Sequence, residues 1–393
     1  MGAQGLLVRE RLPGCRVTDV TVGAAIRFFI VYLRDSHRAP ESGERDAQEE
    51  EMKIMRLRRL LGLLGAILCL LWAPALALGG MTDLGFTRAM DINNSGQIVG
   101  WNGNACMYYG GTMTYLGTLG GYYSQAYGIN TSGQIVGYST NAAGDYRAFL
   151  YSGGVMTNLG TLGGNSSFAN GINDNGQVVG YSTIAGGQTH AFLYSGGSMS
   201  DLGTLGGSYS FAFGINNSGQ IAGYSTTAGG QTHAFLYDGS MHDLGTLGGN
   251  SSAAYGINNS GQIVGTAAPA SGPDHPFLYS NGAMTDLGVL PGYDSGEAYG
   301  INNSGQVVGK IGSSRAFLYS GGVMTDLGTL GGDFSEAAAI NDLGQIVGYS
   351  TTADWGPSAF LYDAGPVPVP GSLLLLGSGL LALAGLGRKF KRN

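Results

Sequence analysis

A motif that recurs seven times along the chain constrains its fold more than any other feature. The string Gly-Gln-(Ile/Val) begins at residues 96, 133, 176, 219, 261, 305 and 344, and an Ile-Asn pair begins four residues before each of these positions. Each repeat also contains Ala-Phe-Leu-Tyr or a variant of it, and a Met-x-x-Leu-Gly string occurs seven times. Residues 81–364 therefore divide into seven repeats of about 41 residues, a length typical of repeat architectures.

Each repeat contains four short segments that we expect to form strands. Examples from different repeats are 254–258, 134–140, 190–194 and 324–328, which contain many β-branched and aromatic residues. Asn-Ser-Gly or a variant separates the first two segments, and Ser-Gly-Gly or a variant separates the last two. Both strings favour tight hairpins, and no repeat shows helical periodicity. The sequence therefore predicts an all-β fold.

Four antiparallel strands in about 40 residues are typical of one β-propeller blade, so we predict a seven-bladed β-propeller. The chain order supports a closed ring, because 81–85 resembles the fourth segment and the repeats end on a third segment at 359–362. Pairing of these two segments would complete the last blade and remove free sheet edges. A β-solenoid is the alternative, but the repeats include no atypical capping unit.

The composition excludes several classes of protein. Glycine contributes 72 of 393 residues without a three-residue period and proline only 11, which excludes collagen. With 43% hydrophobic and 10% aromatic residues, a fully disordered chain is not expected. Residues 81–365 contain 4 Lys/Arg and 17 Asp/Glu, a net charge of −13. This balance argues against a nucleic-acid partner.

The repeats resemble a known bacterial family. The strings Gly-Ile-Asn-x-x-Gly-Gln-(Ile/Val)-Val-Gly, His-Ala-Phe-Leu-Tyr and Met-x-Asp-Leu-Gly-Thr-Leu-Gly-Gly are similar to the extracellular HAF repeats. The resemblance covers residues 81–363, and 78–365 is the predicted repeat domain. The resemblance to HAF repeats implies an exported protein. It does not imply a particular chemical activity.

The chain carries an export signal before the repeats. Residues 55–77 begin with three arginines, continue with an apolar stretch and end in Ala-Leu-Ala, the pattern of a signal peptide cleaved after Ala77. An uncleaved membrane anchor is the alternative. We interpret residues 1–54 as a mis-called N-terminal extension, with Met52 or Met55 as the true start; a cytoplasmic arm is the alternative.

The C-terminal residues 366–393 resemble a sorting signal. The string Val367-Pro368-Val369-Pro370 precedes an apolar run at 371–387, and four cations lie among the last six residues. We expect 371–387 to form a transmembrane helix whose basic end stays cytoplasmic. The order of these parts is similar to the PEP-CTERM signal, with Val369 where that family has Glu. The resemblance implies processing by an exosortase; an ordinary C-terminal anchor is the alternative.

These segments together predict the location of the protein. We expect export, anchoring in the inner membrane through the C-terminal helix, and then a place at the cell surface or outside the cell.

Candidate ligand-binding residues occur where the third segment of a repeat begins. The loop before this segment varies most in length, and loops on a rigid scaffold commonly carry function. In five repeats the residue that closes the loop is basic or a histidine: Arg147, His190, His233, His275 and Arg315. These potential cations predict a rim that binds an acidic polysaccharide. The alternative is that they flank the third strand and pair with nearby acids.

Other acidic residues are expected to have structural roles. Five repeats place aspartate at the same position of Met-x-Asp-Leu-Gly: Asp83, Asp201, Asp243, Asp286 and Asp326. We expect each to accept a backbone hydrogen bond at a strand end; a cation or sugar site is the alternative. Two acidic pairs, Asp294 with Glu297 and Asp333 with Glu336, are expected to be solvated acids in loops; a weak ion site is the alternative.

The sequence contains no nucleophile elbow, zinc-protease helix or phosphate loop. We therefore predict no catalytic residues, cofactor or metal. The expected function is that of a non-enzymatic exported protein with a binding or structural role in the envelope or exopolysaccharide matrix. The alternative is a propeller-type polysaccharide hydrolase or lyase.

Overall fold

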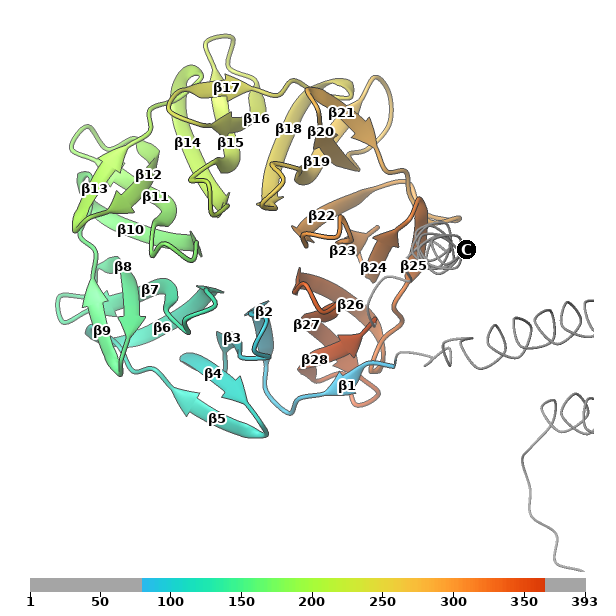
Figure 1. Cartoon of the computed structure of the whole chain (residues 1–393), viewed down its shortest axis with the longest axis horizontal. Helices are drawn as coiled ribbons and strands as arrows, with labels where there is room; N and C mark the ends of the chain where they lie inside the picture. The colour runs from blue at the N-terminus through green and yellow to red at the C-terminus, as the bar shows by residue number, and fades with distance from the viewer. Residues whose placement is uncertain (1–79, 365–393) are drawn as a thin grey trace, which may run out of the picture. The chain divides into compact units, whose positions relative to one another are not determined.

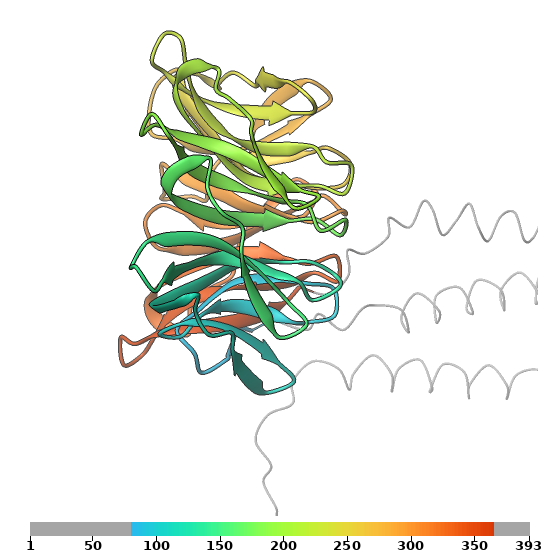
Figure 2. The ribbon, with the colours of Figure 1, turned by 90° about the vertical axis from the view of Figure 1, so that its left-hand side faces the viewer.

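The computed structural model describes residues 80–364. The predicted N-terminal extension, signal peptide, Ala77 cleavage site, Val367–Pro370 motif and transmembrane helix lie outside the described residues. Residues 80–364 form 28 strands and no helix, which confirms the all-β prediction. The strands are grouped in sheets arranged as a ring (Figure 1), and the side view shows the sheets standing next to one another around it (Figure 2). The fold is a β-propeller.

The strand bounds follow the repeats closely. The strands of the first three repeats are β2 (Arg88–Ile92), β3 (Ile98–Trp101), β4 (Ala105–Tyr109), β5 (Thr112–Tyr115), β6 (Gly120–Ile129), β7 (Ile135–Asn141), β8 (Tyr146–Ser152), β9 (Val155–Asn158), β10 (Gly163–Ile172), β11 (Val178–Ile184), β12 (Thr189–Ser195) and β13 (Ser198–Asp201). The next three contain β14 (Gly206–Ile215), β15 (Ile221–Thr227), β16 (Thr232–Tyr237), β17 (Met241–Asp243), β18 (Gly248–Ile257), β19 (Ile263–Pro269), β20 (His275–Ser280), β21 (Ala283–Asp286), β22 (Gly296–Ile301), β23 (Val307–Ile311), β24 (Arg315–Ser320) and β25 (Val323–Asp326). The last set is β26 (Gly331–Ile340), β27 (Gln345–Thr352), β28 (Pro357–Asp363) and β1 (Thr82–Asp83).

Antiparallel pairing connects the four strands of each set. Five sets are separate four-stranded sheets, and the other two are joined into one eight-stranded sheet by a single parallel pairing between Thr232 and Ser251. The first strand of a set, such as β2 or β10, lies nearest the centre of the ring (Figure 1). The inner strands therefore bring the Ile-Asn pairs of all repeats to the centre.

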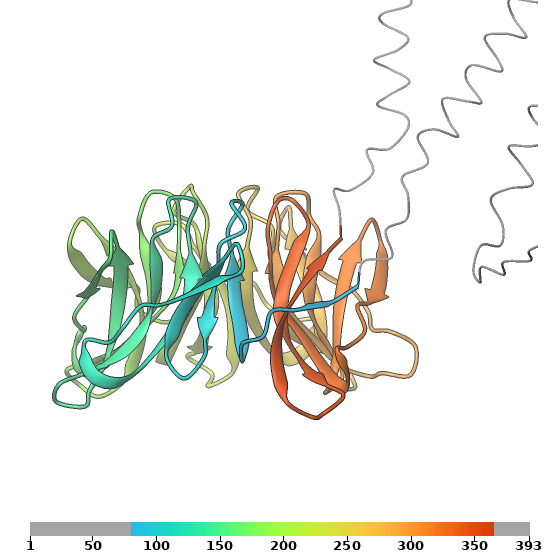
Figure 3. The same ribbon diagram turned by 90° about the horizontal axis from the view of Figure 1, so that it is seen from below.

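The first strand of the described chain completes the last sheet. Thr82 pairs with Leu361 and Asp83 with Phe360, and the N–H of Leu84 donates to the carbonyl oxygen of Ala359 at 2.9 Å. Figure 3 shows β1 against the edge of the β26–β28 sheet. This is the pairing that the sequence predicts between 81–85 and 359–362.

The inner strands are longer than the sequence suggests. The predicted segment 254–258 belongs to β18, which begins already at Gly248, and β6, β10, β14 and β26 also have ten residues. The Gly-Gly that begins these strands looks like a turn in the sequence, but it permits close approach of the next strand. A Cβ at Gly164 would come within 2.3 Å of Thr183 Oγ1. The strand therefore continues through a string that indicates a loop.

The hydrophobic core lies between neighbouring sheets. One cluster combines Val136 and Ala148 of β7 and β8 with Val178 and Phe192 of β11 and β12. The phenylalanine of Ala-Phe-Leu-Tyr is completely buried in six repeats. Cys106 takes its place in the first repeat and packs with Phe86 and Val347, which joins the first sheet to the last. Cys106 is therefore a small, fully buried core residue.

Candidate functional site

The five predicted rim residues occupy equivalent places, but carboxylates accompany the histidines. His190, His233 and His275 stand at the start of β12, β16 and β20. In each case Nδ1 lies 2.8 Å from a carboxylate oxygen of an aspartate in the next strand: Asp201, Asp243 and Asp286. The histidine side chains are only 15–23% exposed. The carboxylates offset any positive charge that these imidazoles carry.

The two arginines of the rim differ from each other. Arg147 lies at the start of β8, and its Nη2 is 2.9 Å from Asp145 Oδ2. Its guanidinium also donates to the backbone carbonyl oxygens of Tyr146 and Asn165. Arg315 begins β24 and is half-buried, and none of the ion pairs within residues 80–364 includes it. Arg315 is therefore the rim cation without a carboxylate at ion-pair distance in the described part of the chain.

The repeated aspartates form turns at the ends of the outer strands, as predicted. Oδ1 accepts a hydrogen bond from the N–H of the glycine two residues later, at 2.7–2.8 Å, for Asp83, Asp201, Asp243, Asp286 and Asp326. Asn158 makes the same bond in another repeat. A side-chain oxygen at this position ends the strand by bonding to the nearby backbone. This local role explains why the aspartate recurs in the repeats, and no ligand is needed to account for it.

The structure corrects the prediction for Glu297 and Glu336. They lie on the inner strands β22 and β26, not in loops. Glu336 Oε1 lies 3.0 Å from Arg88 Nη2, and Lys310 Nζ lies 3.5 Å from Glu336 and 3.9 Å from Glu297. Two cations and two carboxylates balance in this group. The sequence does not reveal it, because its members come from three repeats.

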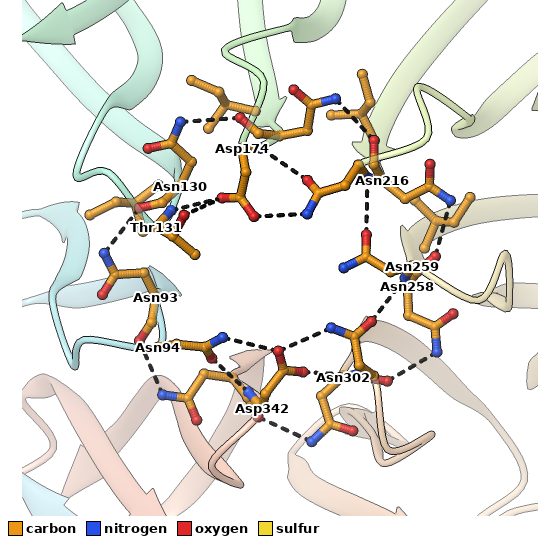
Figure 4. Close-up of a pocket in the computed structure, with 18 of the residues that line it drawn as sticks. Asn93, Asn94, Asn130, Thr131, Asp174, Asn216, Asn258, Asn259, Asn302 and Asp342 are labelled. Atoms are coloured by element: carbon orange, nitrogen blue, oxygen red, sulfur yellow. Dashed lines mark hydrogen bonds between the residues drawn. The ribbon is translucent and has the colours of Figure 1, made fainter.

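A ring of asparagines surrounds one end of the central region (Figure 4). The side-chain Nδ2 of each asparagine in an Ile-Asn pair donates to the backbone oxygen of the next such asparagine, at 3.0–3.1 Å. The ring closes where Asn341 donates to Asn93. Its members are Asn93, Asn130, Asn173, Asn216, Asn258, Asn302 and Asn341. All are buried, so the bonds are shielded from water.

Local bonds hold each asparagine in its orientation. In Asn216, Nδ2 also donates to Gln220 Oε1 at 2.8 Å, while Oδ1 accepts the N–H groups of Ser218 and Gln220. The Asn-x-x-Gly-Gln string is therefore a side-chain turn that also connects neighbouring sheets. The sequence signal for this ring is the asparagine that is present in every repeat. The Ile-Asn pair by itself, however, indicates only that the sequence repeats and not that the asparagines bond to one another.

A second polar layer lies inside the asparagine ring and borders a cavity of about 170 Å³. Its side chains are those that directly follow the ring asparagines: Asn94, Thr131, Asp174, Asn217, Asn259, Asn303 and Asp342. Burial tends to raise the pKa of Asp174, but hydrogen bonds from Thr131 and Asn217 hold it below its ordinary value. Asp342 accepts bonds from Asn303 and Asn94. Amides and hydroxyls thus already satisfy both carboxylates.

Within residues 80–364 no three His, Cys, Asp or Glu side chains are grouped so that they could hold a metal ion. No helix among these residues is long and apolar enough to span a bilayer.

Comparisons with known proteins give structural neighbours only. No family model and no curated protein sequence matches the chain. The β-propeller domain of the Trilobed protease from Pyrococcus furiosus is similar with a TM-score of 0.48 and 10% identity, over 73% of this chain and 93% of that one. TolB from Acinetobacter baumannii gives a TM-score of 0.40 and 14% identity, over 72% of this chain and 65% of TolB. A mutant of the Aleuria aurantia lectin in complex with Fucα1-6GlcNAc gives 0.35 and 12%, over 62% of this chain and 95% of the lectin.

Proposed function

We propose that this chain is an exported, non-enzymatic protein whose repeats form a closed seven-bladed propeller. Its role is to bind or to support other components of the cell envelope or exopolysaccharide matrix. The observation that carries the proposal is the asparagine ring, in which equivalent side chains of all seven repeats make one continuous set of bonds. Such a ring favours a rigid scaffold, because it locks every inner strand to its neighbour.

The use of the other repeated polar groups supports the same role. The aspartates at equivalent outer positions hold turns, and the rim histidines lie beside carboxylates. Catalysis needs a few distinct groups placed around one reacting atom, whereas these groups make the same bond in repeat after repeat. A polysaccharide ligand that is retained without cleavage fits this arrangement.

The location in the proposal rests on the terminal sequences. The signal at 55–77 directs export, the helix at 371–387 holds the protein in the inner membrane, and an exosortase releases it at the Val367–Pro370 motif. To test this, cells expressing the full chain and a version ending at Gly365 are fractionated. We expect the full chain in the membrane fraction before processing and the short version in the periplasm or medium. Equal solubility of the two would contradict the anchor.

A cleavage assay tests the non-enzymatic part. Purified protein is incubated with the exopolysaccharide of its host and the reducing ends and unsaturated products are measured. We expect no more product than in a heat-unfolded control. Steady product release would instead establish a hydrolase or lyase.

A further inference from the structure

One loop of the propeller has a tryptophan where its counterparts have glycine. The β7–β8, β11–β12 and β15–β16 loops contain a turn in which the N–H of Gly144, Gly187 or Gly230 donates to the carbonyl oxygen three residues earlier, at 2.9–3.0 Å. Trp355 makes the same bond to Thr352 at 2.9 Å in the β27–β28 loop. The four residues therefore occupy the same place in the same turn.

The turn requires a backbone conformation that disfavours tryptophan. The three glycines have φ angles of 82–88°, and Trp355 has 64°. A Cβ added at any of these glycines would meet nothing within 4 Å, so the backbone conformation, not a lack of space at the Cβ, favours glycine there. Bulky residues are genuine outliers at positive φ, and such strain concentrates at functional sites.

Burial does not compensate for this strain. Trp355 is 70% exposed. The other non-glycine residue with positive φ in the described chain is Asn281, a residue type that adopts this conformation readily. Trp355 thus exposes a large aromatic surface from an unfavourable turn, and packing among residues 80–364 does not account for it.

A cavity of about 280 Å³ adjoins this loop. Thr352 and Gly356 of the turn help to line it, as do Asp83 of β1 and Asn102 after β3. It lies where the last sheet meets the first. Among residues 80–364, Trp355 is the only exposed tryptophan.

The cavity is lined by hydrogen-bonding side chains. Thr87 Oγ1 donates to Asn102 Oδ1 at 2.9 Å, and Asn102 Nδ2 donates to the hydroxyl of Tyr115 at 3.0 Å. Ser358 Oγ and the N–H of Gly85 both donate to Asp83 Oδ1, so Asp83 Oδ2 is the carboxylate oxygen that these two bonds leave for a ligand. Hydroxyl, amide and carboxylate groups side by side match a ligand with several hydroxyls.

We propose that Trp355 and this cavity form a binding site for a neutral sugar residue of a polysaccharide. The apolar C–H face of a pyranose stacks on the indole, and its hydroxyls bond to Asp83, Asn102 and Thr87. No Lys or Arg lines the cavity, and Asp83 together with the net charge of −13 repels acidic sugars. The volume of about 280 Å³ lies just below the range of small-molecule sites, about 300 to 1,000 Å³, so the cavity takes one sugar unit and the chain continues outside.

This proposal specifies the ligand class for the binding role proposed above, and it rests on that role. Calorimetric titration of the full protein tests the sugar site. The ligands are neutral oligosaccharides of glucose, galactose and mannose, and an oligouronate. We expect at least one neutral oligosaccharide to bind and the oligouronate to bind at least tenfold more weakly. Failure of every neutral oligosaccharide overturns the site, while the fractionation result on export stands or falls separately.

Two variants assign the binding to this site. Trp355→Gly restores the residue of the equivalent turns, and we expect binding at least tenfold weaker with an unchanged or higher melting temperature. Asp83→Asn keeps the turn, as Asn158 does in another repeat, and should also weaken binding. Val155→Ala removes an exposed apolar side chain on β9 and should change neither quantity. Wild-type affinity in Trp355→Gly, or a clear drop in its melting temperature, overturns the proposal.

Discussion

Substitution of one asparagine of the central ring should destabilise the whole propeller. Asn216→Ala removes the hydrogen bonds of Nδ2 to Asn258 O and Gln220 Oε1, and those that Oδ1 accepts from Ser218 and Gln220. Each net bond contributes about 1 kcal/mol, and buried groups left unpaired cost about 1–3 kcal/mol each. We therefore expect a loss of about 3–5 kcal/mol in the free energy of unfolding.

The adjacent residue Asn217 provides a matched control. It is exposed, and its side chain exchanges hydrogen bonds with Asp174 at 2.8–3.0 Å. Water can replace those bonds, so Asn217→Ala should cost about 1 kcal/mol or less. Denaturant titration followed by circular dichroism measures both variants, with the midpoint falling much further for Asn216→Ala.

The isosteric variant Asn216→Asp separates hydrogen bonding from packing. It keeps the shape of the side chain but replaces the Nδ2 donor with an oxygen that faces two oxygen acceptors, Asn258 O and Gln220 Oε1. At neutral pH it should be at least as unstable as Asn216→Ala. The reasoning is refuted if Asn216→Asp has wild-type stability, or if Asn216→Ala and Asn217→Ala lose the same amount.

Two further predictions concern titration and the rim. Burial raises the pKa of Asp91 to about 7, although hydrogen bonds from the N–H groups of Ile129 and Ile92 partly offset this shift. The folded pKa is therefore above that of the unfolded chain. The contribution of Asp91 to stability is complete below about pH 4 and is lost as the pH rises through 7. The free energy of unfolding should be about 2–3 kcal/mol lower at pH 8 than at pH 5, and the difference should be much smaller in Asp91→Asn; an equal pH dependence in the variant would exclude Asp91 as the cause. If the rim binds acidic polysaccharide, Arg147→Gln combined with Arg315→Gln should weaken that binding, more so at low salt, without unfolding the domain, and equal binding by the double variant in a glycan-array titration would exclude the rim.

Local patterns in the sequence are sufficient to predict the strands and their closure. The pairing of β1 with β28 is predictable because 81–85 repeats a motif that otherwise ends each set of strands. The aspartate turns are predictable for the same reason, since an Asp-x-Gly string determines its own hydrogen bond. These features depend on residues within one repeat or on the order of the repeats.

Features that combine several repeats could not be predicted. Arg88 and Glu336 are 248 positions apart in the sequence and meet only because the ring closes. Within single repeats, the carboxylates beside His190 and His233 come from the next strand, so the pairing with nearby acids that the sequence offers as an alternative depends on the register of the hairpin. For Trp355 the sequence does contain a signal, since alignment of the loops places it opposite glycine, but its exposure and the cavity beside it appear only in three dimensions.

The closure of the ring by β1 is the central claim, and a disulfide cross-link tests it most directly. Thr82 and Leu361 are direct partners in the antiparallel ladder, and such partners have Cα atoms about 4.5–5.5 Å apart, within the range for a disulfide. Cysteines are introduced at both positions in a Cys106→Ala background, and peptide mapping by mass spectrometry after mild oxidation identifies the link. We predict a high yield of the 82–361 disulfide and none when the second cysteine replaces Leu318, in β24 of the neighbouring sheet. A folded protein without the 82–361 link, or with equal linkage to position 318, would contradict the closed propeller.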